Sequence, residues 1–311
     1  MYISEMKTGD QVEGFYLLQS ATSKQTAAGK PFLSAVLGDC TSSIDALMWD
    51  YKDQILLTDV GAVVKVRGTV SEFRGAAQIT IDRIRLAVAE DPYNLNDLVP
   101  TAPIDVDAAY RKIQQLITTI SDTDYAAICN EMLQRYGDRF RTIPAAKSVH
   151  HSFLNGLLMH TLYMLQTADY LAGLYSEVVD RSLLLAGTLL HDFAKIEEFK
   201  TSSLGLVTDY SAKGQLLGHL VMGAQEVGRV AEALHTPEEK SVLLQHMILS
   251  HHGEPEFGAA VRPICAESEL LSFIDMIDSR MEIYRETFQE TPAGEFSKRI
   301  FALERRVYHH N

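Results

Sequence analysis

The sequence predicts a multidomain α and β protein, in which a small five-stranded β-barrel precedes an all-α helical bundle. Three observations predict this fold class. Short β-strand patterns fill the chain up to about residue 85, a stretch rich in Pro and Asn follows, and long helical patterns occupy the rest. The 311 residues are enough for about two domains of ordinary size. We expect one domain over residues 1–91, a linker over 92–105 and a helical domain over 106–311.

The first part contains five candidate strands, each rich in β-branched, aromatic or aliphatic residues and bounded by Gly, Asp, Ser or Lys. In the fourth of them, Val64 and Val66 alternate with Lys65 and Arg67, which is the two-residue period of a half-buried strand. The predicted strands cover residues 11–21, 32–38, 43–49, 62–70 and 77–84. Five short strands suit a small closed barrel, for which the OB-fold is the first candidate and an SH3-like barrel the alternative.

The second part shows the spacing of amphipathic helices. The run LLLAGTLL within it is apolar on nearly every side, which predicts a buried helix that ends in His191-Asp192. The predicted helices cover residues 106–120, 123–136, 151–175, 181–197, 214–234, 237–250 and 266–289.

The charge balance limits the kinds of partner. Lys and Arg together number 28 against 41 Asp and Glu, for a formal net charge of −13. This excludes a protein that coats nucleic acid with a basic surface, although it leaves room for a local basic groove. Because an acidic surface repels a charged polymer, the polymer has to be led to any site, and a homo-oligomer that encloses the site is one arrangement that would do so.

Cysteine use and hydropathy indicate the compartment. The three cysteines, Cys40, Cys129 and Cys265, have no C-x-x-C spacing, which argues against a disulfide scaffold and a zinc knuckle and is typical of the reducing cytosol. The longest stretch without charged residues, 148–168, contains histidines, Asn155 and Gln166 and is too polar to span a membrane. No secretory signal is visible at the start. We therefore expect a cytoplasmic protein that has no membrane partner.

The eleven histidines all lie in the second part of the chain. A single buried histidine is most simply a hydrogen-bonded core residue, and an acid pair on a helix is most simply a solvated face. The ordered set is different, because charged groups placed in apolar helices must be paired or bind a metal. The set consists of His160, His191-Asp192, His219, His251-His252, Asp275 and Asp278. Mixed imidazole and carboxylate ligands suit Mn²⁺, Fe²⁺, Co²⁺, Ni²⁺ or Zn²⁺ better than an all-oxygen Mg²⁺ site.

These residues carry a resemblance to a known family. The order His160, His191-Asp192 and a distant Asp275 resembles the HD superfamily of metal-dependent phosphohydrolases, which are all-helical. The surrounding runs are closer still: HHSFLNGLLMHT at 150–161, LHDFAK at 190–195, LGHL at 217–220, SHHG at 250–253, VRP at 261–263, and in the barrel GKPFL at 29–33 and ALMWD at 46–50. In order and spacing, nearly the whole chain resembles the YhaM family of bacterial 3′-to-5′ exoribonucleases.

The resemblance implies two divalent ions, with manganese as the expected metal and Fe, Co, Ni, Zn or Mg as alternatives. It implies that His160, His191, Asp192 and Asp275 bind one ion. It also implies that His219, His251 and His252 hold a second ion, with Asp192 bridging the two as a catalytic residue. Paired ions of this kind clamp the attacking and leaving oxygens in a displacement at phosphorus, and activate the attacking water. Asp278 stays open as the alternative to Asp275 or as a residue that supports it.

Three further residues are candidates for contacts with substrate phosphates. Lys195 lies four residues after His191, so on a continuous helix it would project from the same face, and it resembles the lysine of the HD-x-x-K pattern with a catalytic role. The alternative is a surface lysine at a helix C-terminus. The resemblance also implies contacts from His151 and Arg262. The remaining histidines are expected to be structural or exposed: His150, His235, His246, His309 and His310.

In an OB-fold, ligands bind on strands 2 and 3 and on the loops that join strands 1–2 and 4–5. The first of these loops carries Lys24 and Lys30, and the second carries Phe73 and Arg74. Phe32 and Trp49 would supply stacking faces, unless both belong to the barrel core.

Two hypotheses about function follow. In the first, the barrel holds single-stranded RNA, with single-stranded DNA as a further option, while the helical site removes nucleotides from the 3′ end. In the second, the helical site hydrolyses free nucleotides or cyclic dinucleotides and the barrel regulates it. A nucleic-acid-binding protein with an inactive site is disfavoured, because every ligand position is filled.

Overall fold

The computed structural model describes residues 1–26, 28–73, 75–146, 153–202 and 204–311. The chain divides into two compact units. The barrel unit comprises Met1–Ala102 with Thr201–Thr208, and the helical unit comprises Pro103–Lys200 with Asp209–Asn311. Each unit is described by itself.

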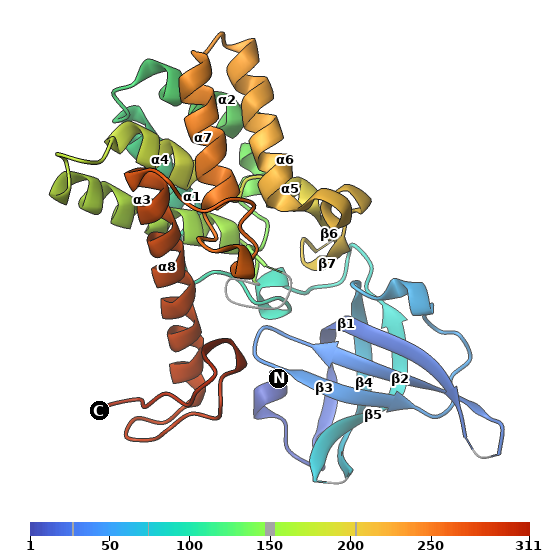
Figure 1. Ribbon diagram of the computed structural model, residues 1–311. Coiled ribbons are helices and arrows are strands. Elements are labelled where there is room, and N and C mark those ends of the chain that lie inside the picture. Colours follow the sequence, from blue (N-terminus) through green and yellow to red (C-terminus); the bar gives the residue numbers. More distant parts are fainter. Residues whose placement is uncertain (27, 74, 147–152, 203) are drawn as a thin grey trace. The chain divides into compact units, whose positions relative to one another are not determined.

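The barrel unit is the predicted closed barrel of five strands (Figure 1). The strands are β1 (Gln11–Gln25), β2 (Pro31–Gly38), β3 (Ser43–Met48), β4 (Val63–Phe73) and β5 (Ala76–Leu86), in the order β1-β2-β3-β5-β4 around the barrel. Strand β4 pairs back onto β1, and only the β3–β5 ladder among these pairs is parallel. Inward-facing side chains such as Leu18, Leu33 and Val66 fill the interior. This is the OB-type topology that the sequence predicts.

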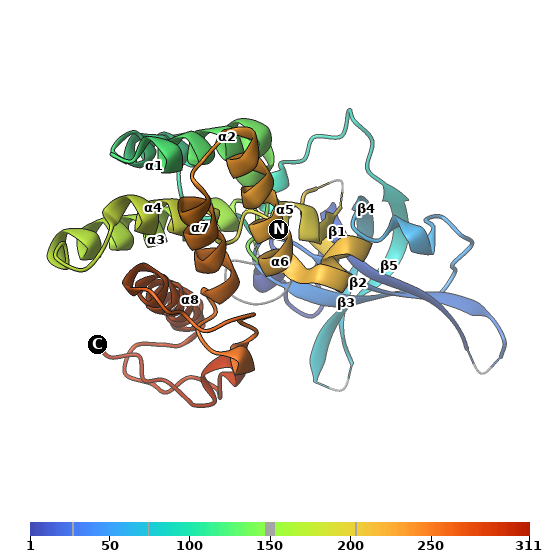
Figure 2. The same ribbon diagram turned by 45° about the horizontal axis from the view of Figure 1, so that its top comes forward.

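The two hairpins of the barrel are longer than the sequence pattern predicts (Figures 1 and 2). The β1–β2 ladder continues from Ala21 opposite Ala35 to Gln25 opposite Pro31. Residues 22–25 in this arm are exposed, so they show no alternation of apolar and polar side chains. Backbone pairing alone defines these arms, and a hydropathy pattern cannot reveal it.

The helical unit contains the predicted long helices. They are α1 (Val106–Thr118), α2 (Thr123–Phe140), α3 (Gly156–Leu174), α4 (Arg181–Leu190), α5 (Lys195–Glu198), α6 (Ala212–Ala233), α7 (Glu238–Ser250) and α8 (Ala266–Glu290). Short 3₁₀ turns occur in this unit at Pro255–Phe257 and Phe301–Leu303. The barrel unit has three, at Ile3–Glu5, Leu57–Asp59 and Leu95–Asp97. A small two-stranded sheet of β6 (Phe199–Thr201) and β7 (Val207–Tyr210) was not predicted.

Helix α4 forms the centre of this unit, as its apolar sequence predicts. All residues from Ser182 to Leu190 are buried, and the helix packs against α2, α3, α7 and α8. Asp180 caps its first turn by accepting hydrogen bonds from the backbone N–H groups of Ser182 and Leu183. Figure 2 shows α3, α4 and α7 as neighbours within this bundle. The residues that follow α4 therefore emerge inside the bundle and not at its surface.

The prediction of one continuous helix over residues 181–197 is wrong. Helix α4 ends at Leu190, turns follow, and α5 begins at Lys195. The side chain of His191 donates from Nδ1 to the carbonyl of Thr188 at 2.8 Å. In a continuing helix that carbonyl would accept from the backbone N–H of Asp192, so the imidazole competes with the helix at this point.

No helix within the described residues is long and apolar enough to cross a membrane. Cys40, Cys129 and Cys265 are free thiols.

Candidate metal centre

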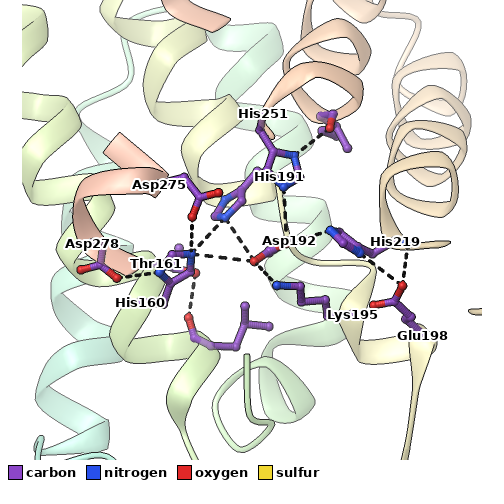
Figure 3. Close-up of polar contacts among 12 residues, drawn as sticks. His160, Thr161, His191, Asp192, Lys195, Glu198, His219, His251, Asp275 and Asp278 are labelled. Carbon is purple, nitrogen blue, oxygen red and sulfur yellow. Dashed lines mark hydrogen bonds and ion pairs between the residues drawn. The ribbon is translucent and has the colours of Figure 1, made fainter. Parts of the chain in front are cut away.

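The predicted ligands come together inside the helical unit, although they are spread over more than a hundred residues of sequence (Figure 3). His160 lies on α3, His219 on α6 and Asp275 on α8, while the His191-Asp192 and His251-His252 pairs follow the ends of α4 and α7. Their ligand atoms form three overlapping groups, each within 4.8 Å: His160, His191 and Asp275; His191, Asp192 and His251; and His219, His251 and His252.

The carboxylate of Asp192 lies between these groups and is almost fully buried. Its Oδ2 is 3.3 Å from Nε2 of His191 and 3.8 Å from Nε2 of His160. Its Oδ1 is 3.4 Å from Nε2 of His219 and 3.7 Å from Nε2 of His251. Each oxygen of one carboxylate thus faces a different pair of imidazoles.

Two of the histidines are oriented by the same kind of hydrogen bond, from the ring to a backbone carbonyl at a helix C-terminus. Nδ1 of His191 donates to the carbonyl of Thr188, and Nδ1 of His251 donates to the carbonyl of Ile248, both at 2.8 Å. These carbonyls belong to the last turns of α4 and α7, where they lack a helical partner. Because Nδ1 of each ring donates to a carbonyl, Nε2 is the atom that faces the centre.

His160 is held between two acidic residues of α8. Its Nδ1 donates to Oδ2 of Asp278 at 2.6 Å, whereas its Nε2 lies 3.4 Å from Oδ1 of Asp275. Asp275 and Asp278 are three residues apart, so both face α3 from one side of the helix. The geometry separates the two acids that the sequence left open: Asp275 lies among the converging atoms, and Asp278 lies behind the His160 ring.

A kink in α6 orients His219. Gly218 has φ 70° and ψ 162°, a conformation that essentially only glycine adopts. Oε1 of the buried Glu198 accepts the backbone N–H of His219 at 2.9 Å and lies 3.2 Å from its Nδ1. Sequence reasoning missed Glu198, because it lies in a four-residue helix beside another glutamate and has no motif of its own.

The charges at the centre favour ligands in the state that binds a cation. Burial lowers the pKa of His251 well below its ordinary value and also lowers that of His252, so both rings are neutral at pH 7. Burial alone would raise the pKa of Asp192, but the charges of Lys195 and His191 hold it well below its ordinary value. Asp192 is therefore an anion surrounded by imidazoles.

Three polar atoms of the centre are buried and make no hydrogen bond with the described residues. They are Oδ1 of Asp192, Nε2 of His219 and Nδ1 of His252. Polar atoms without a partner are costly to bury, and when they are clustered imidazole nitrogens and a carboxylate oxygen they match the ligand preferences of a divalent transition metal. The donor set present in the chain thus fits a metal ion.

The predicted phosphate contacts have different surroundings. Nζ of Lys195 is 2.7 Å from Oδ2 of Asp192, where it neutralises that carboxylate rather than capping a helix. Arg262 is exposed and paired with Glu254. His151 lies outside the described residues. A surface hollow of about 340 Å³ opens beside His251, His252 and Asp275, and its lining includes Arg280, a cation that sequence reasoning missed.

The predicted barrel residues that the structure describes lie on the β1–β2 and β4–β5 hairpins and directly after β3. Phe32 of β2 contacts Trp49 with ring centroids 4.9 Å apart. Trp49 is 53% exposed and Phe73 is 58% exposed, so neither ring belongs to the core. Lys24 donates to Oγ of Ser34 at 3.2 Å, and Lys30 is exposed at the β1–β2 turn. Arg74 lies outside the described residues.

Comparison with protein families matches both units. Residues 157–280 match the HD domain, and residues 21–87 match an OB-fold nucleic acid binding domain. The chain contains an HD domain and an OB-fold domain. The HD domain indicates a metal-dependent phosphohydrolase, its His/Asp cluster could hold divalent metal, and the OB-fold domain indicates binding of nucleic acid.

Two solved structures are each similar to part of the chain. The second OB-fold domain of replication protein A from Methanococcus maripaludis is 20% identical with a TM-score of 0.24, over 30% of this chain and 98% of that one. The mitochondrial single-stranded DNA binding protein from S. cerevisiae is 11% identical with a TM-score of 0.21, over 26% of this chain and 97% of that one.

Proposed function

We propose that this protein is a metal-dependent 3′-to-5′ exoribonuclease of the YhaM type, which hydrolyses single-stranded RNA and also accepts single-stranded DNA. The observation that carries the proposal is the position of Asp192, whose two carboxylate oxygens face separate pairs of imidazoles. A single ion does not require this arrangement, whereas a pair of ions bridged by one carboxylate does. The attached OB-fold domain supports a polymer as the substrate.

In this proposal seven side chains hold two divalent ions. His160, His191, Asp192 and Asp275 hold one, and Asp192, His219, His251 and His252 hold the other. The chemistry that such ions supply is activation of water and stabilisation of charge on the phosphate. The chain itself orients four of the five imidazoles with Nε2 toward the centre, through Thr188, Ile248, Asp278 and Glu198.

The hollow beside the centre receives the 3′-terminal nucleotide. Its wall joins His252 and Asp275 to the exposed guanidinium of Arg280. A guanidinium can make two parallel hydrogen bonds to a phosphate and so fix its orientation. In this proposal Arg280 positions the scissile phosphate, and Lys195 balances the charge of Asp192.

A labelled RNA separates this function from the alternative. With Mn²⁺, a single-stranded RNA labelled at its 5′ end should shorten stepwise from its 3′ end, and EDTA should stop the reaction. The same RNA labelled at its 3′ end should release labelled mononucleotide at once. Intact RNA together with hydrolysis of free nucleotides or cyclic dinucleotides would contradict the proposal and support the alternative phosphohydrolase.

A further inference from the structure

The barrel carries a second surface feature that none of the predicted binding residues explains. A hollow of about 410 Å³ is lined mainly by strands β4 and β5. Four of the lining residues are cations: Lys65, Arg67, Arg83 and Arg85. The acidic side chains in the lining are Glu13 and Asp82, so the lining has a surplus of positive charge in a chain whose net charge is −13.

The cations lie directly opposite one another on neighbouring strands. In the β4–β5 ladder, Lys65 pairs with Arg85 and Arg67 pairs with Arg83. Like charges in directly opposed positions destabilise a sheet. Such an arrangement has a cost to stability, which Glu13, opposite Arg67 on β1, offsets in part and a bound anion would reduce further.

A β-bulge creates this arrangement. The register of the ladder shifts between Arg67 and Gly68, because Gly68 pairs with Ile81 and Asp82 is the extra residue on β5. Ile81 and Ile84 both point into the core, and the bulge between them places Arg83 on the outside opposite Arg67. Without the extra residue, the alternation of side chains would turn Arg83 inward. Bulges commonly redirect a side chain beside a functional site.

Two of the four cations already have acidic partners. Arg85 binds both carboxylate oxygens of Asp91 at 2.7 Å, and Lys65 lies 3.3 Å from Glu13. Neither Arg67 nor Arg83 makes an ion pair with any residue that the structure describes, and both are exposed. The hollow thus offers two guanidinium groups side by side, and its lining contains no aromatic ring on which a base could stack.

We propose that this hollow binds the sugar-phosphate backbone of single-stranded RNA through Arg67 and Arg83, at a place separate from the Phe32–Trp49 face. The inference rests on the proposed function, since it takes the polymer substrate as its ligand. Exposed guanidinium groups bind phosphate oxygens, and contacts to the backbone carry no sequence information. Binding here is therefore independent of sequence and strongly dependent on salt.

The test measures RNA affinity in full-length protein made inactive by Asp192→Asn. A mixed-sequence, fluorescently labelled single-stranded RNA is titrated at several salt concentrations, with and without Arg67→Ala/Arg83→Ala. Loss of two phosphate contacts should reduce the slope of log affinity against log salt by about 1.4. The protein with both arginines binds RNA more tightly than the variant, and the ratio of the two affinities should fall roughly seven-fold as salt rises from 50 to 200 mM.

A matched variant removes the same charge elsewhere on the barrel. Lys7→Ala/Lys52→Ala should leave the slope nearly unchanged, because neither lysine lines the hollow. The melting temperature of the arginine variant should be equal or higher, since the opposed charges are gone, and Arg67→Gln/Arg83→Gln repeats the test with longer side chains. A merely structural role would lower the melting temperature instead.

Three results would overturn the inference. Equal slopes for the arginine and lysine variants would remove these arginines from RNA binding. If inorganic phosphate raises the melting temperature through the arginines while RNA affinity is unchanged, the hollow is a site for free phosphate. If the protein with both arginines intact binds no single-stranded RNA, the proposed function fails together with the inference, which distinguishes this case from the first.

Discussion

Glu198 contacts His219 twice through the same carboxylate oxygen, at the backbone N–H and at Nδ1 of the ring. The buried carboxylate thus fixes the backbone of α6 directly after the kink at Gly218, and it also fixes the orientation of the imidazole. Such residues behind a ligand orient it and raise its basicity. Glu198 is therefore a positioning residue for the half of the centre that contains His219, His251 and His252.

The first prediction is that Glu198→Gln weakens binding of one ion and leaves the other. The amide keeps an acceptor for the backbone N–H but loses the charge, so affinity for that ion should fall roughly 10- to 100-fold. Isothermal titration with Mn²⁺ measures the dissociation constants of the two ions, and only one of them should rise in the variant. Glu232→Gln, an exposed acid on the same helix, is the matched control. Equal loss of both ions, or no loss, would contradict the role.

The second prediction concerns Asp192. Replacing it with Asn should remove both ions together and leave less than a few per cent of the hydrolytic activity, because each oxygen serves a different half of the centre. Breaking its buried pair with Lys195 also costs about 3–5 kcal/mol. Circular dichroism must therefore accompany elemental analysis and kinetics, and Asp192→Asn/Lys195→Gln provides a variant without the unpaired ammonium. A folded variant that keeps substantial activity with the same metal would disprove the bridge.

The third prediction separates the two acids of α8. Asp275→Asn should abolish binding of the ion that His160 and His191 hold, because its carboxylate lies among the converging atoms. Asp278→Asn should weaken that ion roughly 10- to 100-fold, since it only orients the His160 ring. Metal titration of the two variants side by side gives the ranking. A larger loss from Asp278→Asn would reverse the assignment of the two residues.

The sequence predicts the fold of both units because local patterns dominate it. Val64 and Val66 alternate with charged neighbours in a strand, and the LLLAGTLL run of α4 is apolar on nearly every side, so each pattern indicates that its element is buried. The extent of the hairpin arms could not be predicted, since backbone pairing defines them and their side chains are exposed.

The centre could be predicted in part. The order of histidines and acids indicates the ligands, but nothing in the sequence distinguishes Glu198 from its neighbour Glu197. Only the turns after α4 and the kink at Gly218 bring Glu198 to His219. Lys195 shows the same limit. The sequence predicts a continuous helix over 181–197, whereas the hydrogen bond from His191 to Thr188 interrupts it, and no motif marks the pairing of Lys195 with Asp192.

The fourth prediction is that metal removal lowers the stability of the helical unit. Buried ligand atoms meet at the centre from α3, α6 and α8 and from the turns after α4 and α7, and some of them have no hydrogen-bond partner among the described residues. Ions bound there therefore link these five helices. EDTA-treated protein should melt at a lower temperature, and Mn²⁺ should restore the melting temperature. Each ion should add about 2.7 kcal/mol to the free energy of unfolding when free metal is a hundred times its dissociation constant. Scanning calorimetry measures the shift, and elemental analysis should find two ions per chain. Asp192→Asn protein should not respond to Mn²⁺. Equal melting temperatures with and without metal would contradict a role for the ions in the fold.

The fifth prediction assigns stacking to the aromatic rings of the barrel. Trp49 and Phe73 are more than half exposed, so replacing them with Ala removes little buried surface and should leave the melting temperature nearly unchanged. Stacking is worth about 1–3 kcal/mol per base, so each replacement should weaken RNA binding by roughly 5- to 150-fold. The loss should vary little with salt, in contrast to the loss of phosphate contacts.

Anisotropy titrations in the inactive Asp192→Asn protein measure this difference, with Tyr170→Ala as the control for an exposed aromatic residue of the helical unit. Because stacking and phosphate contacts respond differently to salt, the Trp49→Ala variant should shift log affinity by a constant amount, and the Arg67→Ala/Arg83→Ala variant should change its slope. Unchanged affinity in Trp49→Ala and Phe73→Ala would remove the aromatic face from RNA capture. The barrel would then hold the polymer by its phosphates alone.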